Sequence, residues 1–278
     1  MTDRTYDGES PMPTVNRDPR NATLISRTNL SDNHTLFRVR PDVPIPFTAG
    51  QWTEMGLPKA DEGEWGPSGE EFVKDGVVRR AYSIASPTDA PEMEFFFNRV
   101  DEGQLTKWLW ELKEGDRLYV DPESRGHFTL DGVPSGASLI FIATGTGIAP
   151  FACLAREFAG KKRWKRLVII QGARFRQHLG FYEKFRFIEE HDSSILYIPV
   201  LSKPESGWKG DKGHVQNLLN APAAFEKRTG VPLDPGLTHV YLCGNSAMIR
   251  AVEDELMPLG FEPRWSDPDG RIHTEIYY

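Results

Sequence analysis

The second half of the sequence alternates continuous apolar runs with segments of helical period. The apolar runs cover residues 138–144, 166–173, 194–201 and 238–244. Helical segments lie near residues 151–158, 182–190, 215–219 and 247–256. Strands that are apolar along their whole length are buried on both faces, and helices that join such strands place them in parallel. The pattern therefore predicts a doubly wound parallel sheet over residues 135–278, with a last strand near residues 271–278.

The first half follows a different pattern. Between about residues 21 and 130, short runs alternate apolar and polar residues, and most are separated by Gly, Pro, Asp or Asn. This is typical of an antiparallel barrel or sandwich, and the helical period of residues 103–112 predicts one helix that caps it. We therefore expect a β + α/β protein with an antiparallel β-barrel at residues 21–134, after a flexible tail at residues 1–20. Residues 58–78, acidic and rich in Gly and Pro, predict a surface loop.

The composition excludes several classes of function. Lys and Arg number 33 against 40 Asp and Glu, and the net charge of −7 argues against nucleic-acid binding as the main task. No apolar run approaches the roughly 20 residues of a membrane helix. The two cysteines, Cys153 and Cys243, are too few for a disulfide scaffold, a structural zinc site or an iron–sulfur cluster. We expect a soluble cytoplasmic monomer with no metal, no nucleic-acid partner and no membrane contact.

A glycine-rich turn, Ala143-Thr-Gly-Thr-Gly-Ile-Ala-Pro-Phe151, follows the first apolar run directly. Gly145 and Gly147 permit a tight turn and a close approach of backbone, and Pro150 suits the first turn of the next helix. The start of that helix would present free N–H groups and a partial positive charge to a phosphate. The spacing departs from GxGxxG, so a turn without a ligand is the alternative interpretation.

Residues 79–86 read RRAYSIAS and fall on a predicted barrel strand. Alternation puts Arg80 and Tyr82 on one face of this strand, with Ala81 and Ser83 on the other. A guanidinium beside an aromatic ring can hold a phosphate while the ring stacks on a flat heterocycle. The alternative is an amphipathic strand whose tyrosine packs in the barrel core.

Three further segments carry candidate residues. Gly103-Gln-Leu-Thr106 opens the capping helix, so Thr106 and nearby N–H groups offer a second anion site. Cys243 ends the fourth apolar run, where ligands bind in parallel sheets, although a small buried cysteine before a helix is equally common. The last four residues, from Glu275, end in two tyrosines, which we expect to dock on a flat surface.

The order of these motifs, RAYS, GQLT, ATGTGIAPF, CGNSAM and EIYY, resembles ferredoxin–NADP reductases, best the bacterial branch that also serves flavodoxin. The resemblance spans about residues 21–278. It implies that the barrel binds FAD and that the parallel sheet binds NADP. It implies a ferredoxin(flavodoxin)–NADP(+) reductase, an FAD-dependent oxidoreductase. Such an enzyme transfers hydride between NADP(H) and FAD, and single electrons between FAD and ferredoxin or flavodoxin.

The resemblance also implies which residues form the site. Those implied to be catalytic are Ser83, Cys243, Glu275 and Tyr277. Those implied to bind FAD are Arg80, Ala81, Tyr82, Ser83, Phe97, Asn98, Arg99, Gln104, Leu105, Thr106, Thr146, Tyr277 and Tyr278. Those implied to bind NADP are Gly145, Thr146, Gly147, Arg174, Ser202, Lys203, Lys212, Cys243, Gly244, Asn245 and Met248.

The implied roles follow the chemistry of hydride transfer, which needs the two cofactor rings in contact. Tyr82 would cover one face of the flavin and Tyr277 the other, so NADPH would have to displace Tyr277. Ser83 would lie near flavin N5, Cys243 would border the nicotinamide, and Glu275 would handle a proton. Tyr278 would reach toward the FAD adenine.

The preference for NADP rests on three cations. Lys203 and Lys212 fall where the resembled family carries arginines for the 2′-phosphate, and Arg174 adds a third charge. Lysine keeps the charge but loses bidentate geometry, so we expect weaker discrimination between NADPH and NADH than usual. The alternative is that these are solvated surface cations.

The electron acceptor is expected to be acidic and to bind transiently to a basic rim near the flavin. The candidates for that rim are Arg79, Arg99, Lys107 and Arg125. One alternative function is an NAD(P)H reductase component that supplies electrons to an oxygenase or another dedicated carrier. Another is a module that binds FAD or NADP without turnover.

Overall fold

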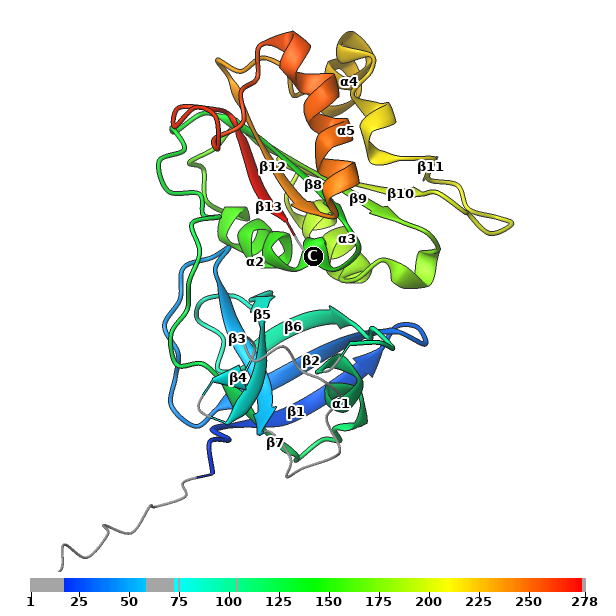
Figure 1. The fold of residues 1–278 in the computed structure, drawn as a ribbon. Coiled ribbons are helices and arrows are strands. Elements are labelled where there is room, and N and C mark those ends of the chain that lie inside the picture. The colour runs from blue at the N-terminus through cyan, green and yellow to red at the C-terminus, as the bar shows by residue number, and fades with distance from the viewer. Residues whose placement is uncertain (1–17, 59–72, 75, 104, 277–278) are drawn as a thin grey trace, which may run out of the picture.

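The computed structural model describes residues 18–58, 73–74, 76–103 and 105–276 of the 278-residue chain. Most of the predicted tail and of the predicted 58–78 loop lies outside these residues. Gln104, Tyr277 and Tyr278 lie outside them as well. The described part forms two lobes, one above the other in Figure 1. None of its helices is long and apolar enough to cross a bilayer.

The first lobe is a seven-stranded antiparallel sheet in the order β4-β5-β3-β7-β1-β2-β6. Its elements are β1 (Ala22–Asn29), β2 (His34–Pro41), β3 (Trp52–Pro58), β4 (Val73–Lys74), β5 (Val77–Ser83), β6 (Met93–Asn98), α1 (Thr106–Glu111) and β7 (Arg117–Val120). The sheet curls so that β5 and β6, near its opposite ends, come together. The amide of Ala85, just after β5, donates to the carbonyl of Glu94 on β6 at 2.9 Å. Alternate residues such as Leu24, Phe37 and Phe95 fill the interior of the barrel.

The second lobe is a six-stranded parallel sheet in the order β11-β10-β9-β8-β12-β13. Its strands are β8 (Ser138–Thr144), β9 (Arg166–Ala173), β10 (Ile195–Leu201), β11 (Asp211–Lys212), β12 (Thr238–Gly244) and β13 (Ile272–Ile276). Its α-helices are α2 (Ala149–Phe158), α3 (Tyr182–His191), α4 (Pro222–Thr229) and α5 (Ser246–Leu256). Short 3₁₀ helices are η2 (Gly145–Ile148), η3 (Arg176–His178), η4 (Val215–Leu218) and η5 (Met257–Leu259).

Helices cover both faces of this sheet. Side chains of α2 and α3, such as Phe151 and Phe185, form one core with one face of β8 and β9. Side chains of α4 and α5, such as Phe225 and Val252, form a second core on the opposite face. This is the doubly wound arrangement that continuous apolar strands predict.

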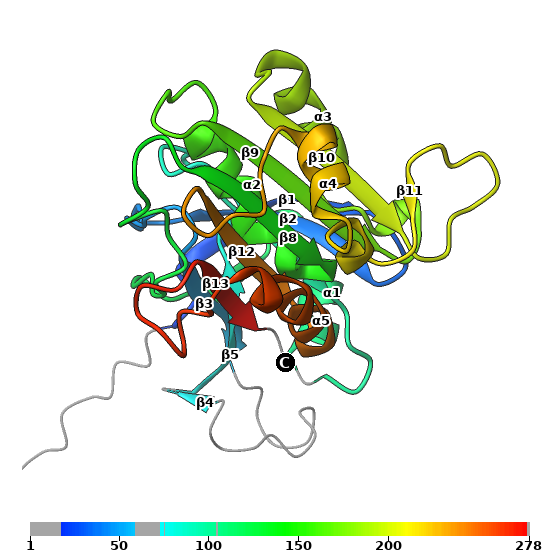
Figure 2. The same ribbon diagram turned by 90° about the horizontal axis from the view of Figure 1, so that it is seen from above.

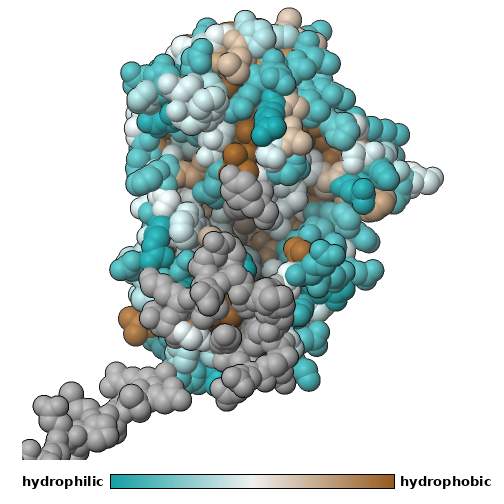
Figure 3. All heavy atoms as spheres, viewed as in Figure 1, coloured by the Kyte–Doolittle hydropathy of each residue, from teal (hydrophilic) through white to brown (hydrophobic). Residues whose placement is uncertain are grey.

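The lobes share a core, in which Phe96 and Phe128 of the first lobe pack with side chains of α2 and α3. Helices α2 and α3 face the barrel in Figure 1, and the parallel sheet lies over the barrel in Figure 2. Phe96 of β6 packs edge-on against Phe181, with ring centroids 5.9 Å apart. Beside it, the carboxylate of Glu94 accepts hydrogen bonds from Lys184 of α3 at 2.6 Å and from Arg156 of α2 at 3.3 Å. The face shown in Figure 3 is mainly hydrophilic and is hollowed between the lobes.

The predicted elements correspond closely to the observed ones. The strands at 138–144, 166–173 and 238–244 have the predicted bounds, and β10 begins one residue later than predicted. The capping helix is shorter than residues 103–112, and α4 was not predicted. The limits of the two domains at residues 134 and 135 remain a prediction.

Candidate functional site

The glycine turn after β8 is as tight as predicted. Gly145 adopts φ +57°, and a Cβ on Gly147 would lie 2.3 Å from the carbonyl oxygen of Cys243. A side chain at residue 147 would therefore push apart the ends of β8 and β12. Pro150 lies in the first turn of α2, as expected. The close approach that Gly147 permits is thus to the neighbouring strand.

A cavity of about 420 Å³ opens at the carboxyl ends of the parallel strands. Strand order reverses between β8 and β12, and the turns that follow these strands both contribute to the cavity wall. Of the residues predicted to bind NADP, those that line it are Gly145, Arg174, Ser202, Asn245 and Met248. The carboxyl edge of a parallel sheet at such a switch point is where ligands bind.

The two predicted lysines are exposed at one side of this cavity. The amide of Lys203 donates to the carbonyl of Arg174 at 3.0 Å, and Lys212 pairs in register with Leu201 of β10. Arg174 thus follows β9, Lys203 lies just after β10, and Lys212 ends the edge strand β11. Their roles remain predictions.

The remaining residues predicted for NADP do not line the cavity wall. They are Thr146, Gly147, Lys203, Lys212, Cys243 and Gly244. Cys243 is fully buried, and its carbonyl faces Gly147. A Cβ on Gly244 would lie 2.5 Å from the hydroxyl of Thr144, so this glycine too serves the packing of the turns.

Two of the predicted catalytic residues meet across the lobes. The hydroxyl of Ser83, at the end of β5, donates to the Glu275 carboxylate on β13 at 3.0 Å. Cys243 is the register neighbour of Glu275 on β12. Ser83 is buried and Glu275 is half-buried, so the bond lies at the edge of the protein interior. The fourth predicted catalytic residue, Tyr277, lies outside the described residues.

Tyr82 is half-buried and packs against the barrel core. Its ring meets that of Phe97 edge-on, with centroids 5.8 Å apart. Burial raises the pKa of the Tyr82 phenol above its ordinary value, so the side chain is neutral. Asn98 follows Phe97 on β6, and its register partner on β2 is His34.

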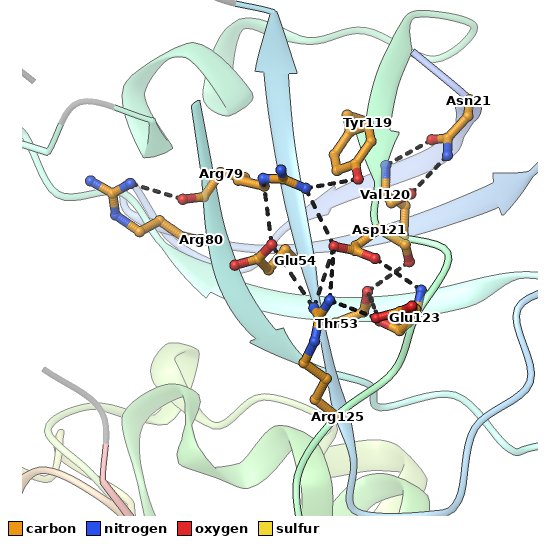
Figure 4. Close-up of polar contacts among 10 residues, drawn as sticks. All are labelled: Asn21, Thr53, Glu54, Arg79, Arg80, Tyr119, Val120, Asp121, Glu123 and Arg125. Carbon is orange, nitrogen blue, oxygen red and sulfur yellow. Dashed lines mark hydrogen bonds and ion pairs between the residues drawn. The ribbon is translucent and has the colours of Figure 1, made fainter. Parts of the chain in front are cut away.

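Adjacent arginines on β5 have opposite surroundings, and their side chains point to opposite sides of the strand in Figure 4. Arg79 is buried, 3.4 Å from a carboxylate oxygen of Glu54 and 3.3 Å from one of Asp121. The predicted place of Arg79 in an exposed basic rim is therefore wrong, because two acidic side chains hold it inside. Arg80 is half-buried and donates to the carbonyl of Arg79 at 2.8 Å.

The loop before α1 uses the Thr106 hydroxyl internally. That hydroxyl accepts from the Val100 amide at 3.0 Å and donates to the Val100 carbonyl at 3.3 Å. Leu105 is buried in the barrel core. Arg99, predicted both for FAD and for the rim, donates to Asp101 at 3.1 Å. Each candidate thus has a contact within the barrel lobe.

Strands β12 and β13 bury a histidine pair two residues before Glu275. Nδ1 of His239 lies 3.0 Å from Nε2 of His273, and the Tyr241 ring stacks on His273 with centroids 4.0 Å apart. Burial lowers the pKa of His239 to about 4 and that of His273 to about 3. Both rings are therefore neutral at pH 7, and one donates its N–H to the other.

Comparison with known proteins decides the family. Residues 141–254 match the oxidoreductase NAD-binding domain family. The flavodoxin/ferredoxin–NADP reductase of Escherichia coli K12 is 32% identical over 216 residues, which cover 77% of this chain and 81% of that protein. The chain belongs to the flavodoxin/ferredoxin–NADP reductase family. This family member is also 27% identical over 255 residues to the ferredoxin–NADP reductase of Pseudomonas aeruginosa, covering 88% of this chain and 92% of that protein.

Solved structures share the fold of this family member. A ferredoxin NADP+ reductase from Neisseria gonorrhoeae with bound FAD and NADP superposes with a TM-score of 0.78 at 23% identity, covering 93% of this chain and 98% of that one. The ferredoxin reductase in carbazole 1,9a-dioxygenase gives a TM-score of 0.69 at 22% identity, covering 93% and 69%. The predicted fold class is confirmed, and so is the resemblance inferred from the motifs.

Three histidines on the cavity wall of this flavodoxin/ferredoxin–NADP reductase family member are not among the site residues predicted from the sequence. They are His34, His178 and His214. His34 belongs to β2 of the barrel, whereas His178 ends η3 of the other lobe. Neither lies in a motif, and no spacing in the sequence could have brought the two together.

Proposed function

We propose that this chain is a ferredoxin(flavodoxin)–NADP(+) reductase that holds FAD in the barrel and NADP(H) in the cavity of the parallel sheet. The observation that carries the proposal is the Ser83–Glu275 hydrogen bond. It joins the barrel strand of Tyr82 to the strand that lies beside β12 at the switch point. A flavin held on the barrel would therefore lie next to a dinucleotide held by the other lobe.

The barrel residues fit a flavin nucleotide. Tyr82 offers a half-buried, neutral ring on which a flat heterocycle can stack, and Phe97 holds that ring from its edge. Arg80 points to the opposite side of β5 from the buried acids that surround Arg79, and a guanidinium is the group that binds a pyrophosphate through paired hydrogen bonds. FAD, when bound, accepts two electrons from NADPH and passes them on singly.

The cavity residues fit a phosphorylated dinucleotide. Arg174 and Ser202 line the wall, and Lys203 and Lys212 lie at its edge. Three cations around one rim favour an additional phosphate over the bare ribose that NADH would present. Because lysines supply two of the charges, we expect the preference for NADPH to be moderate.

Ser83 and Glu275 would act on protons. The Ser83 hydroxyl donates to the Glu275 carboxylate at 3.0 Å, and a hydroxyl oxygen can also accept a hydrogen bond, as from a donor on the flavin edge. The Glu275 oxygen that now accepts from the Ser83 hydroxyl can take up a proton instead. Because Ser83 is buried, the pair would also limit access of water to the reacting edge.

The partner is proposed to be ferredoxin or flavodoxin, bound transiently through charge. Because Arg79 is buried, the basic residues proposed to contact the partner are Arg99, Lys107 and Arg125. Arg99 and Arg125 also have acidic neighbours. Binding is therefore expected to weaken as salt rises. We further propose that the enzyme is a monomer and lies in the cytoplasm.

The enzyme assay compares ferredoxin with flavodoxin, and NADPH with NADH, on FAD-loaded protein. A flavin absorption band that bleaches when NADPH is added without oxygen supports the proposal. A preparation that binds no flavin would overturn it. NADPH oxidation without reduction of either carrier would instead favour the reductase component of another electron-transfer system.

The lysine assignment is tested separately. We expect Lys203→Ala/Lys212→Ala to weaken NADPH binding by about tenfold and to leave NADH binding unchanged, because exposed charge–phosphate contacts contribute about 1 kcal/mol. Lys209→Ala, an exposed lysine of the same loop, is the matched control. Unchanged NADPH affinity in the double variant would refute the assignment.

A further inference from the structure

Two imidazoles from different lobes stack on the wall of the dinucleotide cavity. The rings of His34 and His178 lie 4.6 Å apart between centroids, at an interplanar angle of 27°. Both residues line the cavity together with Arg174. The contact is therefore a seam between the barrel and the parallel sheet, at the site where we propose that NADP(H) binds.

The protein fixes which nitrogen of His34 can take up a proton. Its Nδ1 lies 2.8 Å from Asn33 Oδ1 and 3.0 Å from Ser31 Oγ. The Ser31 hydroxyl itself donates to Asn33 Oδ1, so both oxygens accept from the imidazole. In the neutral ring the hydrogen is therefore on Nδ1. The lone pair is on Nε2, for which the described residues supply no hydrogen-bond partner.

The groups around the pair come from every adjoining element. Phe96 of β6 lies against His34, and Phe175 lies edge-on to His178. The charged neighbours are Arg174, after β9, and Glu205, after β10, and His214 lines the same cavity.

Both imidazoles have lowered pKa values. Burial, with His178 nearby, lowers the pKa of His34 to about 4. Burial and Arg174 lower the pKa of His178, against the opposing effect of Glu205. Both rings are thus neutral at pH 7 while the cavity holds no anion.

We propose that His34 and His178 bind a phosphate group of NADP(H) together with one proton, which only one of the two rings holds at a time. A phosphate between Arg174 and the histidine pair would stabilise an imidazolium and accept its N–H. Two imidazolium rings stacked at 4.6 Å would repel each other, so the pair takes up one proton and not two. The inference rests on the proposed function, because the anion is the dinucleotide.

The consequence is that dinucleotide affinity rises as the pH falls. Uptake of one full proton would change the dissociation constant by about tenfold per pH unit. The 2′-phosphate of NADP+ also titrates, with a pKa near 6 for its second proton, if it follows other phosphomonoesters. Measurements at pH 7.0 to 8.0 keep that group mainly dianionic. In this pH range, a proton that is taken up on binding is therefore assigned to a group of the protein.

The experiment is calorimetric titration of NADP+ into the FAD-loaded enzyme, in two buffers of different ionisation enthalpy at each pH. The dependence of the heat on buffer gives the number of protons taken up. We expect about half a proton or more at pH 7.0, and a dissociation constant larger by about twofold or more at pH 8.0. In His34→Gln/His178→Gln the proton uptake is expected to disappear. The single variants show whether either ring alone retains it.

His191→Gln is the matched control, because His191 is exposed on α3 and bonds only to the Phe187 carbonyl among the described residues. It is expected to keep the proton uptake of the unaltered enzyme. Binding without proton uptake, or uptake that persists in the double variant, would overturn this inference alone. Absence of NADP+ binding at every pH would overturn the proposed function and this inference with it.

Discussion

Replacing Arg79 by methionine is expected to lower the free energy of unfolding by about 3 kcal/mol. The Arg79 side chain is 5% exposed and that of Asp121 6%, while Glu54 is 29% exposed. Removing one partner of a buried ion pair costs roughly 3–5 kcal/mol, because a buried charge is left uncompensated. The lower end applies here, since Arg125 stays 3.3 Å from Asp121 and retains part of the compensation.

Urea unfolding followed by circular dichroism, at one fixed FAD concentration, measures the change. Arg79→Met/Asp121→Asn removes both charges. Its loss in free energy of unfolding is therefore expected to be at least about 1 kcal/mol smaller than the sum of the losses in the two single variants. Arg250→Met, an exposed arginine on α5, is the control and is expected to stay within about 0.5 kcal/mol. If Arg79→Met unfolds like the control, the buried pair does not stabilise the barrel as argued.

Two further predictions concern the lobe interface and the buried histidines. Glu94→Gln is expected to lower the free energy of unfolding by about 1 kcal/mol, because Arg156 and Lys184 are partly exposed and water screens their charges. Differential scanning calorimetry measures this change, and an unchanged melting temperature would contradict it. The free energy of unfolding is expected to fall from pH 6.5 toward pH 4, by up to about 1.4 kcal/mol per pH unit for each of His239 and His273. These rings bind protons when unfolded but stay neutral in the fold. Urea titrations at pH 7, 6 and 5 measure that slope, and a His273→Phe variant with an equally steep fall would refute its cause.

The elements that the sequence predicted best are those whose burial is complete. Residues 138–144 and 166–173 lie between two helical layers, so nearly every position must be apolar and the run ends where the strand ends. Helix α4 was missed because its sequence, PAAFEKRT, carries few apolar side chains, and Phe225 is its buried anchor. A single anchor gives no helical period to detect.

The candidate site was predictable where a motif carries it and not where the lobes combine. Ser83 and Glu275 were identified from family resemblance, and the fold brings them to 3.0 Å. The expectation for Arg79 failed because the acids that bury it lie on other strands. The contact of His34 with His178 depends on how the sheets of the two lobes are placed against each other, which local sequence does not encode.

The position of β13 has a consequence for the order in which the molecule is assembled. Every barrel strand precedes residue 121, whereas β13 follows all other described strands in the sequence. During translation the barrel can therefore close long before Glu275 leaves the ribosome. A chain halted between residue 121 and β13 would therefore have every barrel strand but would lack the hydrogen bond from Ser83 to Glu275.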